Sequence, residues 1–432
     1  MSVPLSPAAP SSHLRAFFVP ILMMLFGLSL FAGQAPESSI SELKPSFARV
    51  RESIRARMLK EVIPSVSVAV AKDGKILWEE SFGWADREKR IPADQHTLYA
   101  LASVSKPITG TALMILQERG RLDLDRPVND YLRGARLTSY AWDPSKATVR
   151  QIATHTAGLA TFVGPSRRLS LDDTIARYGV IVRPPGESFD YSNLGYKVLD
   201  GLIAPLSGTS YADFLRSEVF SPLGMTRASA GVGPGLGDYV AAQYAGGGGQ
   251  RIETDRSPES GSVYCSAHDL VQFGLFHLKA DLPSQKTILS HAGIDAMQKP
   301  TATVDASHGY GLGWWVKENH FGYRVVFVHG GNFVANASLV LVPSERIAVA
   351  VLSNTGSELA ATTCDSILSA LLPRFREAQA TRIGRLHARA TRNRRKNCTA
   401  HGPDWCEPTK PMSPLPFLLG KQAIFARNLG PS

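Results

Sequence analysis

Residues 98–120, LYALASVSKPITGTALMILQERG, join an apolar segment, a serine–lysine pair and an apolar helix pattern. Ser103 and Lys106 are three residues apart, so they share one face of a helix. Pro107 suits the first turn of a helix, and Gly120 suits a position just after its end. The stretch therefore predicts a helix over 108–119 with Ser103 at its buried start and the amine of Lys106 beside the Ser103 hydroxyl.

This pair of side chains indicates nucleophilic chemistry. A serine hydroxyl reacts when a base takes its proton or when a nearby positive charge stabilises the alkoxide, and lysine can do either. A helix N-terminus adds positive potential and free N–H groups. A second S-x-x-K copy, Ser41 to Lys44, lacks these apolar flanks, and we interpret it as exposed polar sequence.

The second candidate motif is Tyr191-Ser192-Asn193, which follows the turn sequence Pro184-Pro185-Gly186. A tyrosine hydroxyl can relay a proton when neighbouring cations lower its pKa. Asn193 could hold a substrate amide and hydrogen-bond Lys106. Taken in isolation, the motif would more often be a loop without a function.

The third candidate motif is His329-Gly330-Gly331, at the end of a predicted strand over 323–329. Adjacent glycines near a strand let another backbone approach closely. Such an edge could receive an extended acyl group, with a backbone N–H completing an oxyanion hole. His329 taken alone would more often be a turn residue.

The periodicity of the rest of the chain predicts a mixed α/β fold of the α+β type. Residues 41–64 have a helical pattern, and the Asp73-Gly74 pair inside 65–83 predicts a tight hairpin. Helix patterns dominate from about 100 to 300, and strand patterns return near the C-terminus. We expect an antiparallel sheet built from both ends of the chain, flanked by helices, with a helical region inserted. The remaining predicted helices cover 196–206, 211–219 and 357–372, and the remaining predicted strands cover 311–316, 335–342 and 347–352.

Charge divides the chain into a globular part and a tail. The 432 residues carry a net charge of +10, of which 374–432 contribute +9 through 12 Lys+Arg and 3 Asp+Glu. We interpret 36–373 as the globular domain and 374–432 as a disordered basic tail. Cys398 and Cys406 in that tail either pair with each other or remain free thiols. A binding role for the tail is the weaker interpretation, and no nucleic-acid partner is expected.

The N-terminus resembles an export signal. His13 and Arg15 precede an apolar run over 16–32, and Gly33-Gln34-Ala35 offers small residues for cleavage. We therefore predict that 1–35 directs the protein to the periplasm or the medium. A retained segment that attaches the protein to the membrane is the alternative.

Three motifs in the order S-x-x-K, Y-x-N and H-G-G resemble those of the penicillin-recognising serine hydrolases. That family includes class C β-lactamases, D-alanyl-D-alanine carboxypeptidases, esterases and D-aminopeptidases. The resemblance covers roughly 40–373 and implies a β-lactamase/transpeptidase-like fold. Further family-like segments lie at 148–159, 220–225 and 309–314.

The resemblance also implies roles for individual residues. Ser103 would be the acyl-accepting nucleophile, Lys106 its base or electrostatic activator, and Tyr191 the proton relay. Asn193 would position the substrate amide. The oxyanion hole would use the backbone N–H groups of Ser103 and Asn332. His155, in the segment 148–159, is interpreted as structural.

The third motif departs from the K-T-G of β-lactamases. His329 replaces a lysine and Gly330 replaces a hydroxyl residue, while Gly331 matches. A neutral histidine would not attract a substrate carboxylate, so the resemblance favours carboxypeptidases, peptidases and esterases over efficient β-lactam turnover. We expect an acyl-enzyme hydrolase for a small-molecule or peptide substrate: a β-lactam, a D-amino-acid peptide or an ester. A non-catalytic binding module is the alternative. The sequence carries no motif for a metal or an organic cofactor, so none is expected.

Overall fold

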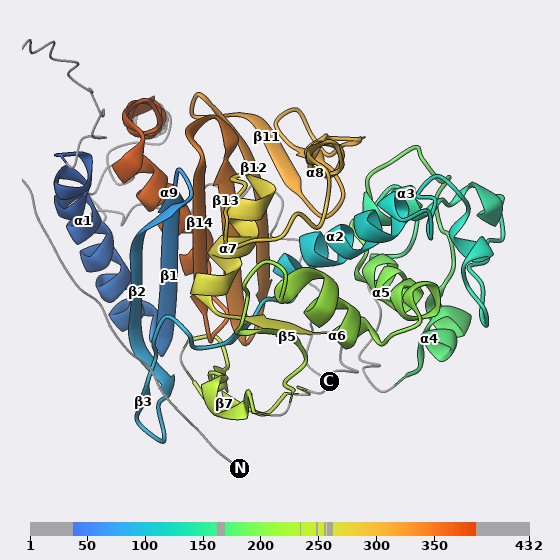
Figure 1. Cartoon of the computed structure of the whole chain (residues 1–432), viewed down its shortest axis with the longest axis horizontal. Coiled ribbons are helices and arrows are strands. Elements are labelled where there is room, and N and C mark those ends of the chain that lie inside the picture. Colours follow the sequence, from blue (N-terminus) through green and yellow to red (C-terminus); the bar gives the residue numbers. More distant parts are fainter. Residues whose placement is uncertain are drawn as a thin grey trace, which may run out of the picture.

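The computed structural model describes residues 38–161, 169–233, 235–247, 249–254, 256 and 262–385. Its centre is a nine-stranded sheet in the order β3-β2-β1-β14-β13-β12-β11-β10-β9 (Figure 1). All neighbouring strands of this sheet run antiparallel. The central strands come from both ends of the chain, and a helical region lies beside the sheet. The mixed α/β prediction is therefore confirmed.

The strands of the large sheet are β1 (Ser65–Lys72), β2 (Lys75–Asp86), β3 (Ile91–Pro92), β9 (Ala302–Thr303), β10 (Gly309–Tyr310), β11 (Trp315–His320), β12 (Tyr323–Asn332), β13 (Ala335–Val342) and β14 (Ile347–Ser353). The smaller sheets contain β4 (Tyr99–Ala100), β5 (Ala228–Ala230), β6 (Gln243–Tyr244), β7 (Arg251–Ile252) and β8 (Val263–Cys265). The α-helices are α1 (Ser38–Glu61), α2 (Ser105–Glu118), α3 (Val149–Ala153), α4 (Leu171–Tyr178), α5 (Asn193–Ser207), α6 (Tyr211–Phe214), α7 (Ala267–His277), α8 (His291–Gln298) and α9 (Leu359–Leu371).

The hairpin that opens the sheet turns where the sequence predicts. Asp73 and Gly74 both have positive φ, at 51° and 77°, and Lys72 pairs directly with Lys75. A two-residue turn of this kind matches the right-handed twist of the flanking strands. It thereby fixes which residues of β1 face each side of the sheet.

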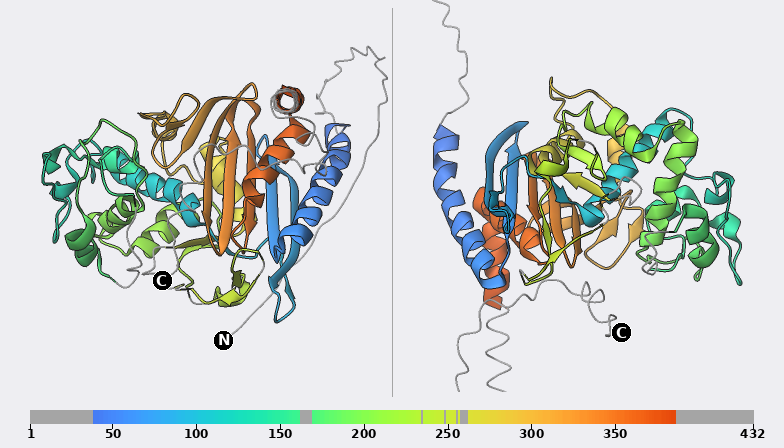
Figure 2. Two further views of the ribbon diagram at one scale, coloured as in Figure 1. Left: turned by 180° about the vertical axis from the view of Figure 1, so that it is seen from behind. Right: turned by 90° about the horizontal axis from the view of Figure 1, so that it is seen from below.

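Apolar side chains alternate along the central strands and form two cores. On one face, α1 and α9 cover a cluster that includes Val68, Val349 and Ile367 (Figure 2). On the other face, α2 and α7 cover a cluster that includes Leu352 and Ile108 (Figure 1). Burying each such side chain contributes about 1.5–3 kcal/mol. The second core also anchors the start of α2, where Ser103 lies.

Two predicted elements differ in type from what the structure contains. In the strand expected over 311–316, residues 311–314 form a turn that separates β10 from β11, and only the last two residues belong to β11. A side chain on Gly313, whose φ is 83°, would come within 2.7 Å of the Pro107 backbone at the start of α2. The helix expected over 211–219 stops as an α-helix at Phe214 and continues as a π-helical turn, η4 (Leu215–Phe220).

The expected domain end at residue 373 is also wrong. Residues 373–385 are helical, and Phe375 is fully buried in the core under α9. Its ring contacts those of His320 and Phe321 at the end of β11. Packing against these rings extends the ordered domain beyond α9. The predictions for residues 1–35, for the rest of the tail and for Cys398 and Cys406 fall outside the described residues.

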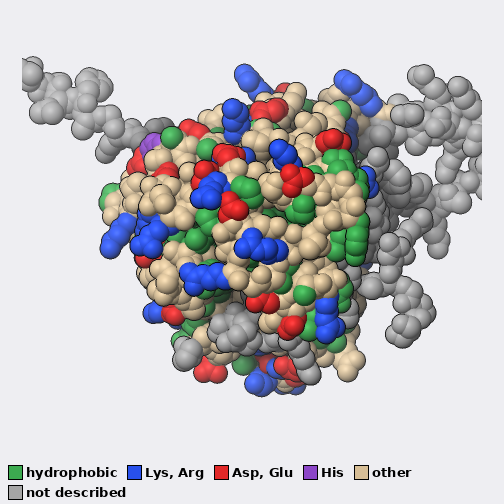
Figure 3. Space-filling view, turned by 90° about the vertical axis from the view of Figure 1, so that its right-hand side faces the viewer, with side chains coloured by type: hydrophobic (Ala, Val, Ile, Leu, Met, Phe, Trp, Pro, Cys, Tyr) green, Lys and Arg blue, Asp and Glu red, His purple; other side chains and the backbone are tan. Residues whose placement is uncertain are grey.

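The surface at the helical end of the molecule mixes both signs of charge. Lys and Arg side chains lie interspersed with Asp and Glu (Figure 3). None of the helices in the described part of the chain is long and apolar enough to cross a bilayer.

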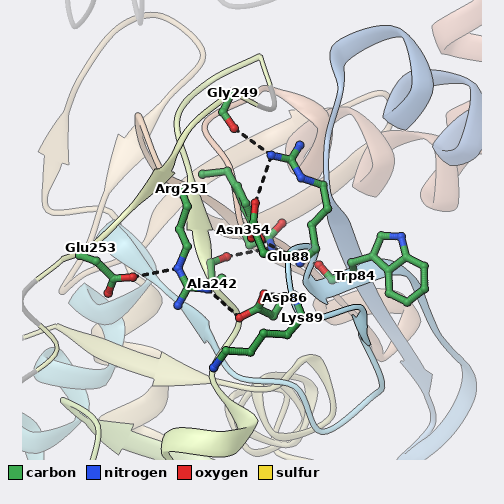
Figure 4. A network of polar contacts seen from close by, with 11 residues as sticks. Trp84, Asp86, Glu88, Lys89, Ala242, Gly249, Arg251, Glu253 and Asn354 are labelled. Atoms are coloured by element: carbon green, nitrogen blue, oxygen red, sulfur yellow. Dashed lines mark hydrogen bonds and ion pairs between the residues drawn. The ribbon is translucent and has the colours of Figure 1, made fainter.

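Asn354, just after β14, joins three segments by buried hydrogen bonds. Its Oδ1 accepts from Ser65 N at 3.0 Å. Its Nδ2 donates to Ala242 O at 2.9 Å and to Trp84 O at 3.4 Å (Figure 4). Beside it, Arg251 pairs with Asp86. This network holds the segment with β6 and β7 against the ends of β1 and β2.

We predict that Asn354→Ala lowers the free energy of unfolding by about 2–4 kcal/mol, because it leaves buried backbone groups of Ser65 and Ala242 without partners. Urea unfolding measures this change. Asn319→Ala removes an exposed turn bond to Gly322 N and serves as the control. Equal losses in the two variants would contradict the importance of the buried network.

Candidate active site

Ser103 lies in a short 3-10 turn, η1 (Ala102–Val104), that runs directly into α2. The helix therefore starts at Ser105 rather than at residue 108. Ala102 has φ 47°, an unfavourable conformation for a residue with a side chain. This turn presents a half-buried Ser103 at the start of α2 while Val104 points into the core.

The hydroxyl of Ser103 accepts two hydrogen bonds. Lys106 Nζ donates at 3.1 Å, and Tyr191 Oη donates at 2.8 Å. Lys106 Nζ also donates to Asn193 Oδ1 at 3.0 Å. Asn193 is the first residue of α5, and Tyr191 lies two residues before it. The structure thus brings the first two predicted motifs together from segments about 90 residues apart.

The amine of Lys106 is buried, with an exposed fraction of 7% for the residue. Its Nζ lies 4.8 Å from the ring centre of Tyr191 and 5.2 Å from that of Tyr196. The rings and the two oxygen acceptors together replace the water that a charged amine loses on burial. This arrangement fixes the amine next to the Ser103 hydroxyl.

The sequence does not predict two neighbours of this cluster, Thr109, which is buried, and Asp200. Thr109, one helical turn after Lys106, donates to Asp200 Oδ1 at 2.8 Å, and Tyr211 Oη lies 3.0 Å from the same threonine hydroxyl. Burial raises the pKa of Asp200 to about 7, although the Thr109 hydrogen bond and the charge of Lys106 both lower it. The spacing of Asn193 and Asp200, seven residues on one helix face, is the signal that could have identified this carboxyl group.

Gly330 makes the close contact between β12 and the Ser103 turn. A Cβ at this position would lie 2.8 Å from Ser103 N, 2.9 Å from Val104 N and closer still to Leu101 O. Gly331 has more room, since its nearest neighbour would be Asn336 Nδ2 at 3.5 Å. The first glycine, rather than the second, is therefore required by packing.

His329 is not hydrogen-bonded to the Ser103 cluster in the described structure. Its Nδ1 bonds Ser338 Oγ at 2.8 Å, and burial lowers its pKa to about 4, so the ring is neutral at pH 7. Its ring centre is 4.9 Å from that of Phe327, which contacts Trp315. Trp315 in turn lies beside Tyr191, so a row of rings connects His329 with the site.

The end of β12 leaves an edge next to Ser103. The β11 register on this strand ends at Phe327, whereas β12 continues to Asn332. Asn332 pairs with Ala335, and its Oδ1 accepts from Val334 N at 2.9 Å. Its N–H as half of an oxyanion hole stays a prediction. Within the described ranges, no cluster of three or more His, Cys, Asp or Glu residues could hold a metal ion.

The family follows from comparison with known proteins. The family model described as Beta-lactamase matches residues 50–371. The chain belongs to the beta-lactamase family. This membership agrees with the order of the three motifs and with the convergence of the first two at Ser103.

Two solved structures and one curated relative extend this finding. The octameric penicillin-binding protein homologue from Pyrococcus abyssi has a TM-score of 0.64 and 25% identity, over 75% of this chain and 76% of that one. A class C beta-lactamase has a TM-score of 0.67 and 20% identity, over 77% and 97%. The β-lactamase/transpeptidase-like fold is thereby confirmed. Protein flp of Staphylococcus aureus (strain MRSA252) is 26% identical over 313 residues, and the match covers 68% of this chain and 60% of that protein.

We predict that Gly330→Ala lowers the rate at which a fluorophosphonate labels Ser103 by about 100-fold, because the added carbon separates β12 from the Ser103 turn. Gly331→Ala, where space exists, is the matched control and should label within a few fold of the unchanged chain. Timed intact-mass measurements give both rates. Similar losses in the two variants would show that the close contact has no special importance.

A second prediction concerns Asp200 and stability. Its pKa rises from about 3.9 in an unfolded chain to about 7 in the folded one, so the folded state binds more protons between these pH values. This contribution to stability is present below about pH 4 and is lost as pH rises through 7. Relative to Asp200→Asn, the unchanged chain should lose about 1 kcal/mol or more between pH 4.5 and 7.5 in urea unfolding. Asp295→Asn, which removes an exposed carboxylate, is the control variant. A curve for the unchanged chain that runs parallel to that of Asp200→Asn would refute the assignment.

Proposed function

We propose that this chain is a serine hydrolase that transfers an acyl group from its substrate to Ser103 and then to water. The observation that carries the proposal is the pair of hydrogen bonds that Ser103 Oγ accepts from Lys106 Nζ and Tyr191 Oη. A hydroxyl held by an amine and a phenol has both the means to lose its proton and a route for returning that proton to a leaving group.

The reaction would begin when Ser103 Oγ attacks the substrate carbonyl carbon and its proton passes to Lys106 Nζ in the neutral amine form, while Tyr191 keeps its own proton. The backbone N–H groups of Ser103 and Asn332 would stabilise the negative oxygen of the tetrahedral intermediate. Tyr191 would then protonate the leaving alcohol or amine as its bond to the carbonyl carbon breaks. A water molecule would attack the resulting ester, returning the proton to Ser103 and releasing the acid.

The substrate would carry an amide, lactam or ester carbonyl. The neutral ring of His329, with its pKa near 4, supports a substrate without a carboxylate at that position, such as a small ester. D-Ala-D-Ala carboxypeptidase and β-lactamase activities are the alternatives, since the family name alone separates none of these. We further propose that residues 1–35 direct export of the protein. This segment would either be cleaved off or remain as a membrane anchor.

The test is a timed intact-mass experiment on the full chain with three probes: a penicillin, p-nitrophenyl acetate and a fluorophosphonate. We predict an adduct on Ser103 and an ester hydrolysis rate that falls at least about 1,000-fold in Ser103→Ala. Tyr191→Phe should lower the rate by about 10- to 1,000-fold, because it removes the proton relay. A long-lived penicillin adduct would favour the carboxypeptidase alternative, and rapid penicillin hydrolysis would favour the β-lactamase alternative.

Ser105→Ala is the matched control, because Ser105 is the first residue of α2 and its hydroxyl makes no hydrogen bond to Lys106 or Tyr191 in the described structure. It should keep the activity of the unchanged chain. Hydrolysis that persists in Ser103→Ala would contradict the assigned nucleophile. The absence of adducts with all three probes would instead favour a non-catalytic binding module on this fold.

A further inference from the structure

His155 makes hydrogen bonds to the residues on both sides of Tyr191. It follows α3, and its backbone carbonyl accepts from Asp190 N at 2.8 Å. Its ring Nδ1 accepts from Ser192 N at 3.0 Å. One residue therefore holds the backbone N–H groups of both neighbours of the tyrosine whose hydroxyl reaches Ser103.

The imidazole also packs directly against the Tyr191 ring, with the two centres 4.3 Å apart. Only 2% of the residue is exposed, and the rings of Phe189, Tyr196 and Tyr310 surround it. Burial, and then the charge of Lys106, hold the pKa of His155 well below its usual range. Because Nδ1 accepts a hydrogen bond, the proton of the neutral ring is assigned to Nε2.

The backbone at this position makes a histidine costly. His155 has φ 60°, where glycine is unstrained and asparagine is tolerated, whereas other residues cost about 1–3 kcal/mol. The backbone bond to Asp190 N would be available to any residue type. The ring bond to Ser192 N and the contact with Tyr191 are what the imidazole adds.

We propose that His155 is a positioning residue whose neutral imidazole holds the Tyr191 hydroxyl on Ser103. The inference rests on the proposed role of Tyr191 in proton transfer. Without the acceptor at Nδ1, Ser192 N–H would be buried without a partner, and the 190–192 segment would shift to find one. A displacement of about 1 Å is enough to cost a positioned group much of its effect, about 100-fold in rate.

The test compares His155→Gly with His155→Asn, because both substitutions suit the positive φ and should fold. Asparagine retains a side-chain oxygen that can accept from Ser192 N–H, whereas glycine does not. We expect His155→Gly to lower kcat for p-nitrophenyl acetate by about 10- to 100-fold with little change in KM. The kcat of His155→Asn should be at least about fivefold higher than that of His155→Gly, because asparagine restores a side-chain acceptor for Ser192 N–H.

A double-mutant cycle separates positioning from general structural damage. In a Tyr191→Phe background, His155→Gly should lower kcat by less than about twofold, because the group it positions is already gone. Urea unfolding of each variant shows that it is folded under the assay conditions.

Equal losses in both backgrounds, or equal losses for glycine and asparagine, would overturn the positioning role while leaving the serine hydrolase intact. The absence of Ser103 labelling by a fluorophosphonate in the unchanged chain would overturn the proposed function and, with it, this inference.

Discussion

A buried lysine amine needs acceptors around it, and in this fold the acceptors come from two different helices. Lys106 Nζ donates to Ser103 Oγ at the start of α2 and to Asn193 Oδ1 at the start of α5. Removing either partner would leave a buried N–H group of the amine without its acceptor, at a cost of about 1–3 kcal/mol. The interaction therefore ties α2 to α5, and it also sets the position of the serine hydroxyl. The contact between the two helices and the position of the serine hydroxyl therefore depend on the same three atoms: Lys106 Nζ, Ser103 Oγ and Asn193 Oδ1.

The large sheet lies next to this cluster because residue 330 is a glycine and has no side chain. β12 lies so close to the Ser103 turn that only glycine fits between Leu101 O and Ser103 N. The same strand runs beyond the register of β11, which leaves an edge beside the hydroxyl. Such an edge can pair with an extended acyl group, as an added strand pairs with a sheet. Gly330 thus lets β12 pack beside Ser103, where the free edge of the strand would be available to a substrate.

Local signals in the sequence predict part of this structure well. The Asp73-Gly74 turn, the helix after Ser103 and the strands β13 and β14 follow from periodicity and turn chemistry. The turn at 311–314 does not, because apolar and aromatic residues suggest a strand there while Gly313 is required by contact with Pro107. The burial of Phe375 is likewise decided by residues far away in the chain.

Prediction of the site from the sequence is limited in the same way, because contacts between distant segments decide part of it. The order of the motifs predicts that Ser103, Lys106, Tyr191 and Asn193 converge, but not that Thr109 and Asp200 lie behind the lysine. It also gives no indication that His155 flanks Tyr191, since that contact joins segments about 35 residues apart. Thr109, Asp200 and His155 fill space and supply hydrogen-bond acceptors. Many residue types can do this, so their surroundings in the fold must be known before they can be identified.

Backbone strain on both sides of Ser103 Oγ links these features. Among the described residues, most non-glycine positions with positive φ are in turns at the ends of strands and helices. Ala102 and His155 also follow a strand and a helix, but one directly precedes Ser103 and the other contacts the tyrosine that is hydrogen-bonded to Ser103. Each conformation costs about 1–3 kcal/mol and persists only where surrounding contacts enforce it. The enforcing contacts are those of Gly330 with the Ser103 turn, and those of Asp190 and Ser192 with His155. The two groups that meet at 2.8 Å are therefore each held by packing from outside, and the hydrogen bond between them is a consequence of that packing rather than its cause.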